Sequence, residues 1–191
     1  MTLNDLRNKQ IIYASAPVVY RKYEKEGFKT PSKKVECYSE RFKSCNYEPL
    51  PVFQYPKESH MTKPEWLSKS SLLGTTRKPA EFVHTKHRNL PEITKTYPDP
   101  LVWVHPTDAR TRGVRQNEIV EVKSPRGRIQ VKAKITEDVG PGLVAIDFGW
   151  GNPSDMKSNL NLLTSDEVWD PISGGYPNRL FLCEIEKLVK A

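Results

Sequence analysis

"PLVWVHPTDARTRGVRQNEIVEVKSPRGRIQVKAKIT", residues 100–136, is the stretch of sequence that indicates the class of fold. Residues 101–105 are a short apolar run typical of a buried strand. A helix is predicted over residues 106–112, because Pro106 suits a first helical turn and Gly113 suits the position after the last one. Residues 118–123 and 128–135 then alternate apolar and polar side chains on either side of the turn SPRG. This period of two predicts a β-hairpin with one buried face.

Further strand signals lie on both sides of this stretch. Residues 71–75 are predicted to be a short strand that ends in Gly-Thr-Thr, and residues 143–146 are a fully apolar run after the tight turn GPG at 140–142. A last strand is predicted over residues 180–186. Six or so short strands with one or two small helices favour a closed β-barrel over an open sheet. The predicted fold class is therefore mainly β.

Residues 1–66 differ in composition and periodicity from the rest of the chain. They are rich in aromatic residues, lysine and proline, but they show little sustained periodicity. The segment LPVFQYPKES (50–59) carries two prolines, which favour irregular backbone. We expect this part to be an arm that lies on another surface. The predicted organisation is thus an arm over residues 1–66 and a barrel over residues 67–191.

Composition limits the class of protein. Of the 191 residues, 37% are hydrophobic and 28% are charged, which allows a packed core beneath a well-solvated surface. The longest apolar runs, 101–104 and 143–146, are far too short to span a bilayer, so no direct membrane insertion is expected. The first residues, MTLNDLRNKQ, lack the apolar core of a secretory signal. A cytoplasmic location is expected, or a periplasmic one if a partner carries the export signal.

The chain is basic, with a formal net charge of +7 and an isoelectric point near 9.2. This balance favours an anionic partner. However, the basic residues are scattered among acidic ones, and no RNA-recognition or zinc-finger pattern accompanies them. We expect no nucleic-acid partner, since RNA binding has only the isoelectric point in its favour. A phosphate-bearing small ligand or an acidic partner protein fits the charge equally well.

Sequence patterns for catalysis or metal binding are missing. There is no GxSxG nucleophile motif and neither of the usual nucleotide loops, GxxxxGK[ST] and GxGxxG. Cys37, Cys45 and Cys183 show no CxxC spacing and are expected to be buried or free thiols, not a metal site or a disulfide set. His84 and His87 could share one helix face, but a metal site needs further ligands. Hydrogen-bonded or exposed histidines are the favoured interpretation.

Two loop regions carry more specific chemistry. In LLGTTRKPAEFVHTKHRNLP (72–91), the backbone N–H groups of the Gly-Thr-Thr turn and a neighbouring guanidinium could hold a pyrophosphate. The alternative is a solvated basic loop. In SNLNLLTSDEVWDPISGGYPNRL (158–180), Asn and Asp side chains could bind the donor and acceptor edges of a purine or pterin ring. The alternative is that these residues form ordinary turns.

Four segments in one order carry a family resemblance: GFKTPSKKVECYSERF (27–42), LLGTTRKPAEFVHTKHRN (72–89), the stretch quoted first, and NLLTSDEVWDPISGGYP (161–177). Together they resemble the C-terminal part of the molybdopterin oxidoreductases of the dimethyl-sulfoxide-reductase-like family, namely their molybdopterin dinucleotide-binding domain with the preceding linker. The similarity covers nearly the whole chain. It implies a double-psi β-barrel of the aspartate-decarboxylase-like class. It also implies binding of molybdopterin guanine dinucleotide, the organic part of a bis-pterin molybdenum or tungsten centre.

The resemblance also implies which residues contact the cofactor. Thr75, Thr76 and Arg77 match the strand-end loop that faces the phosphates and the pterin. The family usually has Thr-Gly at or near the position before the arginine, whereas this chain has Thr-Thr, so the close backbone approach expected of that glycine is not matched here. His84 and Thr85 match the His-Ser/Thr pair that contacts the cofactor after this loop.

The C-terminal segment supplies the remaining matches. Asn161 corresponds to the Asn of the Asn-x-Leu-Thr motif, and Asp170 with Ser173 corresponds to the Asp-Pro-x-Ser-Gly turn. Arg179 stands where the family often has a Lys or Arg, and could contact a phosphate or a pterin oxygen. These residues complete the set predicted to bind the cofactor.

The resemblance implies that the metal is bound by other domains. In the family, the metal ligand and any iron–sulfur cysteines lie upstream, and Cys37, in the linker motif, does not match them. We expect a fragment, a split-gene product or a small subunit that completes a larger catalytic chain, and no catalysis from this chain alone. The alternative is a double-psi barrel that binds proteins and no longer binds the cofactor. The altered Gly-Thr-Thr-Arg order favours that alternative, and the intact Asn161 and Asp170 oppose it.

Overall fold

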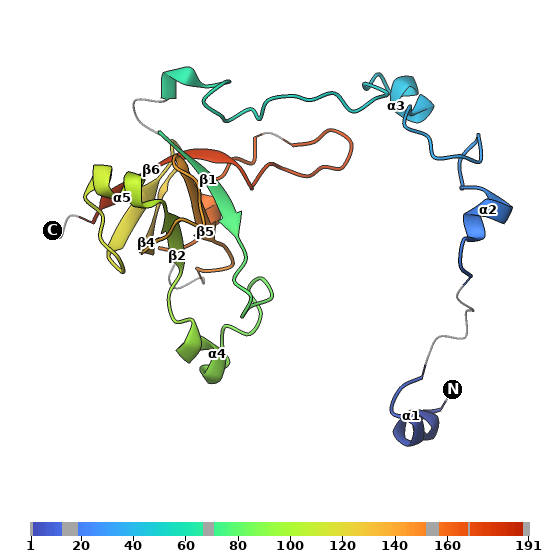
Figure 1. Ribbon diagram of the computed structural model, residues 1–191, viewed down its shortest axis with the longest axis horizontal. Helices are drawn as coiled ribbons and strands as arrows, with labels where there is room; N and C mark the ends of the chain where they lie inside the picture. Colours follow the sequence, from blue (N-terminus) through green and yellow to red (C-terminus); the bar gives the residue numbers. More distant parts are fainter. Residues whose placement is uncertain (1, 13–18, 67–70, 152–156, 168, 189–191) are drawn as a thin grey trace. The chain divides into compact units, whose positions relative to one another are not determined.

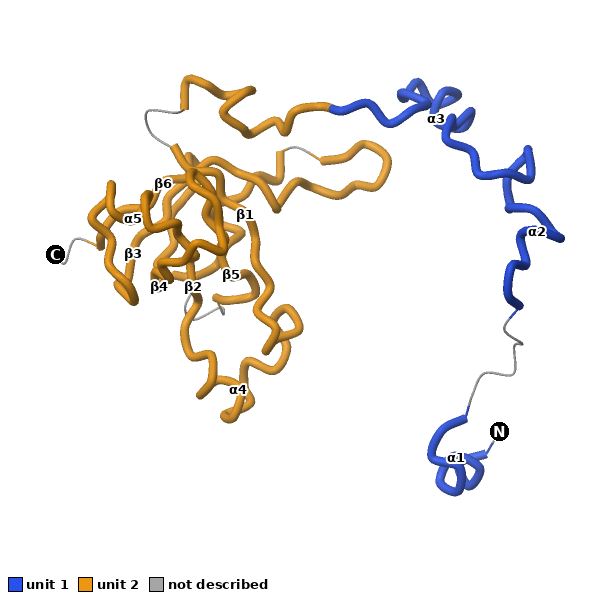
Figure 2. The backbone as a smooth tube through the Cα atoms, viewed as in Figure 1, with its two compact units in different colours: residues 1–53 blue, residues 54–191 orange. Residues whose placement is uncertain are grey.

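The computed structural model describes residues 2–12, 19–66, 71–151, 157–167 and 169–188 (Figure 1). The chain divides into two compact units, Met1–Phe53 and Gln54–Ala191 (Figure 2). The boundary predicted between residues 66 and 67 lies beside residues 67–70, which are outside the described part, and it stays a prediction. Residues 54–66 belong to the same unit as the barrel.

The first unit is the irregular arm expected from the sequence. Its three short helices are α1 (Leu3–Lys9), α2 (Lys22–Glu26) and α3 (Glu40–Ser44). Side-chain caps stabilise two of them: Thr2 and Asp5 form a capping box at α1, and the Ser39 hydroxyl accepts a hydrogen bond from the Phe42 N–H at α3. No described residue of this unit is buried. The described part of this unit thus has local structure but no hydrophobic core of its own.

The second unit is built on a closed six-stranded barrel. Its strands are β1 (Leu72–Arg77), β2 (Leu101–Val104), β3 (Ile119–Lys123), β4 (Arg128–Ile135), β5 (Leu143–Asp147) and β6 (Phe181–Lys187). Around the barrel their order is β1-β5-β2-β4-β3-β6. Two neighbouring pairs are parallel, β1 with β5 and β2 with β4, and the others are antiparallel. This arrangement confirms the predicted double-psi β-barrel.

The stretch at residues 100–136 folds as its pattern predicts. β3 and β4 pair as an antiparallel hairpin in which Lys123 faces Arg128 across the turn. α5 (Pro106–Arg112) starts with proline in its first turn and ends at Gly113, whose φ of 65° is the left-handed conformation that glycine adopts without strain. A second helix, α4 (Pro91–Thr96), was not predicted, because six residues are too few for a helical period to be visible.

The core fills the barrel with side chains from every strand. In β4 the alternating residues Ile129, Val131 and Ala133 are buried, whereas the predicted fourth member, Ile135, is only partly buried at the end of the strand. β5 is buried continuously from its second residue, as its unbroken apolar run predicts. None of the helices in the described part of the chain is long and apolar enough to cross a membrane.

Gly74 allows one large core residue to sit against β1. It pairs with Phe181 across the β1–β6 ladder, and a Cβ added at Gly74 would come under 3.0 Å from three atoms of the Phe181 ring. Phe181 is 1% exposed, so its ring has no free space into which it could move. The glycine before the Thr-Thr-Arg sequence therefore has a packing role.

We expect Gly74→Ala to lower the free energy of unfolding by about 1–3 kcal/mol, because the new methyl group overlaps a fully buried ring. Gly140→Ala is the matched control, since a Cβ at Gly140 meets nothing within 4 Å. Urea unfolding followed by tryptophan fluorescence measures both changes. Equal stability of the two variants would show that the Phe181 ring does not constrain this position.

Candidate functional site

The barrel topology brings several separate segments to one of its ends. β1 and β5 run parallel and finish together, with Arg77 opposite Asp147. β2 begins and β6 begins at the same end, because each is antiparallel to one of these two strands. Residues 78–100 after β1, residues 148–151 after β5 and residues 169–180 before β6 therefore all leave or enter the barrel here. We call this the β1–β5 end.

All of the residues predicted to bind a cofactor lie on strands or segments at the β1–β5 end. Thr75, Thr76 and Arg77 form the last part of β1. Asn161 lies in a short 3-10 helix, η2 (Leu160–Leu162), which packs near the β3–β4 turn: a Cβ added at Gly127 would lie 2.7 Å from the Leu162 carbonyl oxygen. The structure thus gathers these residues at one end of the barrel, and their role in binding stays a prediction.

A buried carboxylate organises this end. Asp147 is completely buried, and its oxygens accept hydrogen bonds from Arg77 Nη1 at 2.6 Å and from the Tyr97 hydroxyl at 2.5 Å. The backbone N–H of Leu101, the first residue of β2, donates to the same carboxylate at 3.0 Å. One side chain therefore joins the ends of β1 and β5, the start of β2 and the residue that follows α4.

This network fixes the position and charge of Arg77. The guanidinium also lies over the Trp103 ring, with 4.0 Å between Cζ and the ring centroid. Burial acts to lower the pKa of Arg77, but the hydrogen bond and charge of Asp147 outweigh it and raise that pKa. Burial and Asp147 raise the pKa of Tyr97 above its ordinary value, which keeps the phenol neutral. Arg77 is therefore already paired with a carboxylate, and its availability to a phosphate is reduced.

The loop after β1 is attached to the segment after β5. His84 has a φ of 55°, and its ring packs against Phe148 with 5.1 Å between centroids. Gly149 has a φ of +85°, and a Cβ there would lie 2.6 Å from the His84 carbonyl oxygen. Glycine is thus required for this close approach. The guanidinium of Arg88 completes the attachment by donating to the Phe148 carbonyl at 3.2 Å.

A cavity of about 290 Å³ opens beside this loop. Its lining residues come from the loop after β1, from α4 and from the segment after β5: Thr85, Arg88, Thr94, Gly149, Trp150 and Gly151. A second cavity, of about 510 Å³, shares Trp150 and Gly151 with it. Of the predicted site residues, only Thr85 lines either of these two cavities.

The C-terminal segment contacts β1 through its backbone. The Thr75 hydroxyl donates to the Arg179 carbonyl at 2.8 Å, which places the end of this segment against the strand. The side chains of Arg179 and Asn161 are exposed. Within the described residues, the side-chain amide group of Asn161 has no hydrogen bond, although its backbone N–H donates to Asn159. Thr76 is partly buried and likewise has no side-chain hydrogen bond there.

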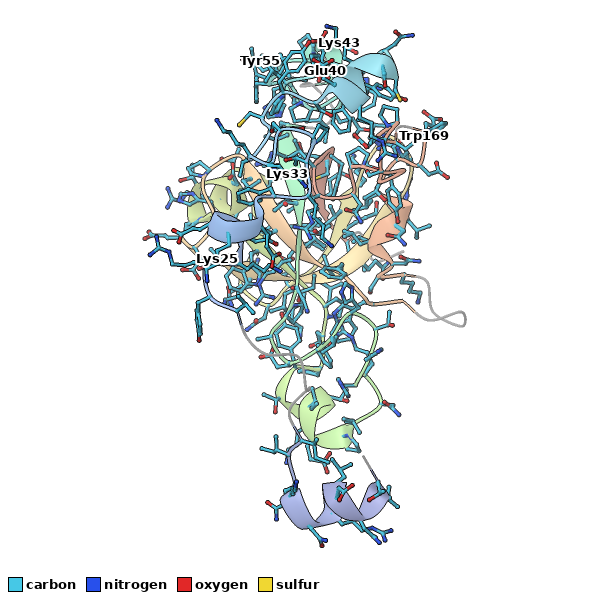
Figure 3. The ribbon with its side chains drawn as sticks, turned by 90° about the vertical axis from the view of Figure 1, so that its right-hand side faces the viewer. Lys25, Lys33, Glu40, Lys43, Tyr55 and Trp169 are labelled. Atoms are coloured by element: carbon cyan, nitrogen blue, oxygen red, sulfur yellow. The ribbon has the colours of Figure 1, made fainter. Side chains whose placement is uncertain are left out.

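Asp170 and Ser173 form a turn. Asp170 Oδ1 accepts hydrogen bonds from the N–H groups of Ile172 at 3.1 Å and Ser173 at 2.6 Å, and the Ser173 hydroxyl accepts one from Gly175. The hydrogen bonds from Ser173 and, to a smaller extent, Ile172 lower the pKa of Asp170. The loop they shape carries Trp169, which is 62% exposed (Figure 3). In this structure the side chains of Asp170 and Ser173 thus form the contacts of an ordinary turn.

Three further residues at this end, and the role of a fourth, could not be predicted from the sequence. Asp147 is the last residue of the apolar strand β5 and Trp150 follows it, where no motif distinguishes either of them. Tyr97 directly follows α4, in the segment that leads to β2. Arg88 was visible only as one basic residue of a basic loop. The Phe-Gly-Trp-Gly sequence at 148–151 was the available signal, because two glycines beside a tryptophan indicate close backbone approach.

No three His, Cys, Asp or Glu residues of the described chain come together as a metal site. Cys37 and Cys45 are exposed, and Cys183 is buried in β6. Burial raises the pKa of the Cys183 thiol, so this cysteine stays protonated.

Comparisons with known proteins agree on one family. Residues 72–181 match the family described as "Molydopterin dinucleotide binding domain". The chain is 31% identical over 186 residues to acetylene hydratase of Syntrophotalea acetylenica, covering 89% of this chain and 25% of the relative. It is 29% identical over 182 residues to a probable dimethyl sulfoxide reductase chain of Escherichia coli K12, covering 84% of this chain and 21% of that relative.

A solved structure gives the same result. The acetylene hydratase from Pelobacter acetylenicus matches with a TM-score of 0.83 and 25% identity. That match covers 98% of this chain and 28% of the acetylene hydratase chain, so it includes the arm as well as the barrel. The chain thus spans only about a fifth to a quarter of the curated relatives named above.

We expect Asp147→Asn to lower the free energy of unfolding by about 3–5 kcal/mol, because it leaves the Arg77 guanidinium partly buried without a counter-charge. Asp99→Asn is the control: it breaks an ion pair with Lys132 whose side chains are 39% and 30% exposed, and about 1 kcal/mol or less is expected. Chemical denaturation compares the two variants. If Asp147→Asn lowers the free energy of unfolding no more than Asp99→Asn does, the organising role of the Asp147 carboxylate is contradicted.

The Asp170 turn should open in acid. Because its folded pKa is lowered, the ionised carboxylate stabilises the turn above the ordinary Asp pKa, and this contribution is lost as the pH falls through the folded pKa. NMR should show the Ile172 and Ser173 amide signals shifting together with that titration, and Asp170→Asn should remove the shift. Amide signals that do not follow Asp170 would contradict the hydrogen bonds described.

Proposed function

Because the chain belongs to the molydopterin dinucleotide binding domain family, the C-terminal dinucleotide-binding domains of molybdopterin oxidoreductases, we propose that it binds a molybdopterin dinucleotide at the β1–β5 end. The proposed form is the guanine dinucleotide of a bis-pterin molybdenum or tungsten centre. One observation carries the proposal: the family match at 72–181 includes the three segments that the topology brings to this end.

The residues at this end fit an anionic group rich in hydrogen-bond acceptors. Buried N–H groups of Arg88 and Trp150 have no partner in the described chain. The buried carboxylate of Asp147 is neutralised by Arg77, so it does not repel a phosphate. Donors without partners beside a cavity are what a ligand that supplies acceptors requires.

The predicted residues take different parts in this proposal. Thr75 holds the C-terminal segment against β1, and Asp170 and Ser173 shape the loop within that segment. The exposed amide of Asn161 offers both a donor and an acceptor to the edge of a ring. Thr85 faces the cavity beside Arg88. When bound, the cofactor supplies the pterin-ligated metal at which the redox chemistry takes place.

A larger catalytic chain or domain is the proposed partner. The curated relatives extend over several times the matched length, and the match to acetylene hydratase includes the arm. The arm exposes large apolar side chains, including Tyr20 at 86%, Val35 at 67% and Phe53 at 77%. The same unit carries lysines, such as Lys25, Lys33 and Lys43 (Figure 3). Such a surface fits a partner that is apolar with an acidic rim.

The proposal predicts that tagged chain, purified anaerobically from its native host, carries pterin and co-elutes with a large partner. Asn161→Ala and Thr85→Ala should each reduce the pterin content several-fold, because each removes a side chain that we propose to hydrogen-bond the ligand. Oxidised-pterin fluorescence per mole of chain is the measurement. Thr111→Ala, on α5 at the opposite end of the barrel, is the control and should keep the wild-type content.

Two results would count against the proposal in different ways. Unchanged pterin in both site variants would show that the residue assignments are wrong. Partner without pterin in the wild-type sample would favour the alternative function, a barrel that binds proteins and no longer binds the cofactor.

A further inference from the structure

The Arg88 guanidinium lies between two aromatic rings. Its Cζ is 3.6 Å from the centroid of the Phe82 ring and 4.0 Å from that of the Trp150 ring. Nη2 donates to the Phe148 carbonyl at 3.2 Å, with a longer contact of 3.5 Å to the His84 carbonyl. The plane and position of the guanidinium are thus fixed by stacking and by one good hydrogen bond.

The remaining donors of this cluster are not used. Arg88 Nε and Nη1 and Trp150 Nε1 are buried and have no hydrogen-bond partner in the described chain. Burial lowers the pKa of Arg88 from its ordinary value, with Asp147 and Tyr97 only partly opposing that effect, yet a guanidinium stays charged in proteins. Buried donors without acceptors are costly, and those on a charged group are costlier still. Such a cost is expected where a ligand supplies the missing acceptors.

The charge of Arg88 also lacks a counter-ion among the residues that the structure describes. The nearby acid, Asp147, is already paired with Arg77, and Tyr97 stays neutral for the reason given above. No carboxylate of the described chain forms an ion pair with Arg88. Among the described residues, the cluster therefore carries a positive charge without a paired carboxylate, which favours an anion over a neutral acceptor.

The adjoining cavity sets the size of that anion. Arg88 and Trp150 both line the cavity of about 290 Å³, which is at the lower limit for small-molecule sites. Gly149 and Gly151 lie on its wall, and each has close neighbours that a side chain would strike: a Cβ would be 2.6 Å from the His84 carbonyl oxygen at Gly149 and 2.8 Å from the Asn159 Cβ at Gly151. The space suits one group of a ligand, not a whole dinucleotide.

We propose that Arg88 and Trp150 form a subsite for a single phosphate-type oxyanion beside Thr85. This rests on the proposed function, because a dinucleotide brings such a group in its pyrophosphate. Inorganic pyrophosphate offers the same chemistry and serves as the probe for the chain without its partner. In this subsite the stack on Phe82 positions the guanidinium, and the free N–H groups bind the oxyanion.

The test separates ligand binding from a merely structural role. Arg88→Met keeps a flexible apolar side chain between the two rings but removes the charge and the donors. Without ligand, its thermal unfolding midpoint should equal or exceed that of the wild type, because a buried unpaired charge is gone. Its affinity for pyrophosphate, measured by calorimetry at low salt, should fall roughly tenfold or more. The affinity of Arg88→Lys for pyrophosphate should lie between those of the wild type and Arg88→Met, since lysine keeps the charge without the planar stack.

Arg115→Met is the matched control, an exposed arginine at the opposite end of the barrel, and should bind pyrophosphate as the wild type does. Two results would overturn the subsite: wild-type affinity in Arg88→Met, or a loss of affinity accompanied by a lower unfolding midpoint, which would show a structural role.

Pterin content in the purified complex identifies the source of the anion and separates this proposal from the previous one. Arg88→Met with wild-type pterin content would overturn the assignment to the dinucleotide. If the wild type holds pterin but binds no inorganic pyrophosphate, Arg88→Met must lose pterin or the subsite is wrong. If the wild type binds pyrophosphate through Arg88 but carries no pterin, the proposed function fails while the oxyanion subsite stands.

Discussion

The carboxylate of Asp147 is the constraint on which the rest of the β1–β5 end depends. It is fully buried, and it holds Arg77, Tyr97 and the first N–H of β2 together. A buried carboxylate with three donors is stable only if all of them are kept in place. The strand ends are thereby fixed relative to one another, and the loops that follow β1 and β5 start from a rigid base. That rigidity is what a ligand site built from separate loops needs.

The alternation of apolar and polar residues was enough to predict the hairpin at β3–β4, because it depends only on local spacing. Pro106 and Gly113 were enough to predict α5, and the number of short strands favoured a closed barrel. The family motifs placed the predicted site residues on segments of one end. The contacts of Arg77 could not be predicted, since its partner Asp147 is 70 residues away in an apolar strand. Arg88 was hidden for a related reason: its stack needs Phe82 and Trp150, and only the folded loops bring these rings to the same guanidinium.

The two arginines at this end differ in a way that charge alone does not show. Arg77 has a buried carboxylate as partner, and so it supports the architecture. Arg88 has aromatic rings on both faces and unpaired N–H groups at its edges, and so it retains binding capacity. Asp170 and Ser173 likewise use their polar atoms within their own turn, whereas Asn161 does not. The polar residues of this end therefore divide into those whose side chains are used within the described chain and those whose side chains keep unpaired donors or acceptors there.

Hydrogen–deuterium exchange on the purified complex, before and after removal of its pterin, tests most directly that one end of the barrel holds the ligand. The account predicts that loss of pterin increases exchange at residues 75–88, 147–151 and 159–179. Exchange near α5 and at residues 136–142, at the opposite end, should stay unchanged. Increased exchange confined to that opposite end, or none at the β1–β5 end, would contradict the account.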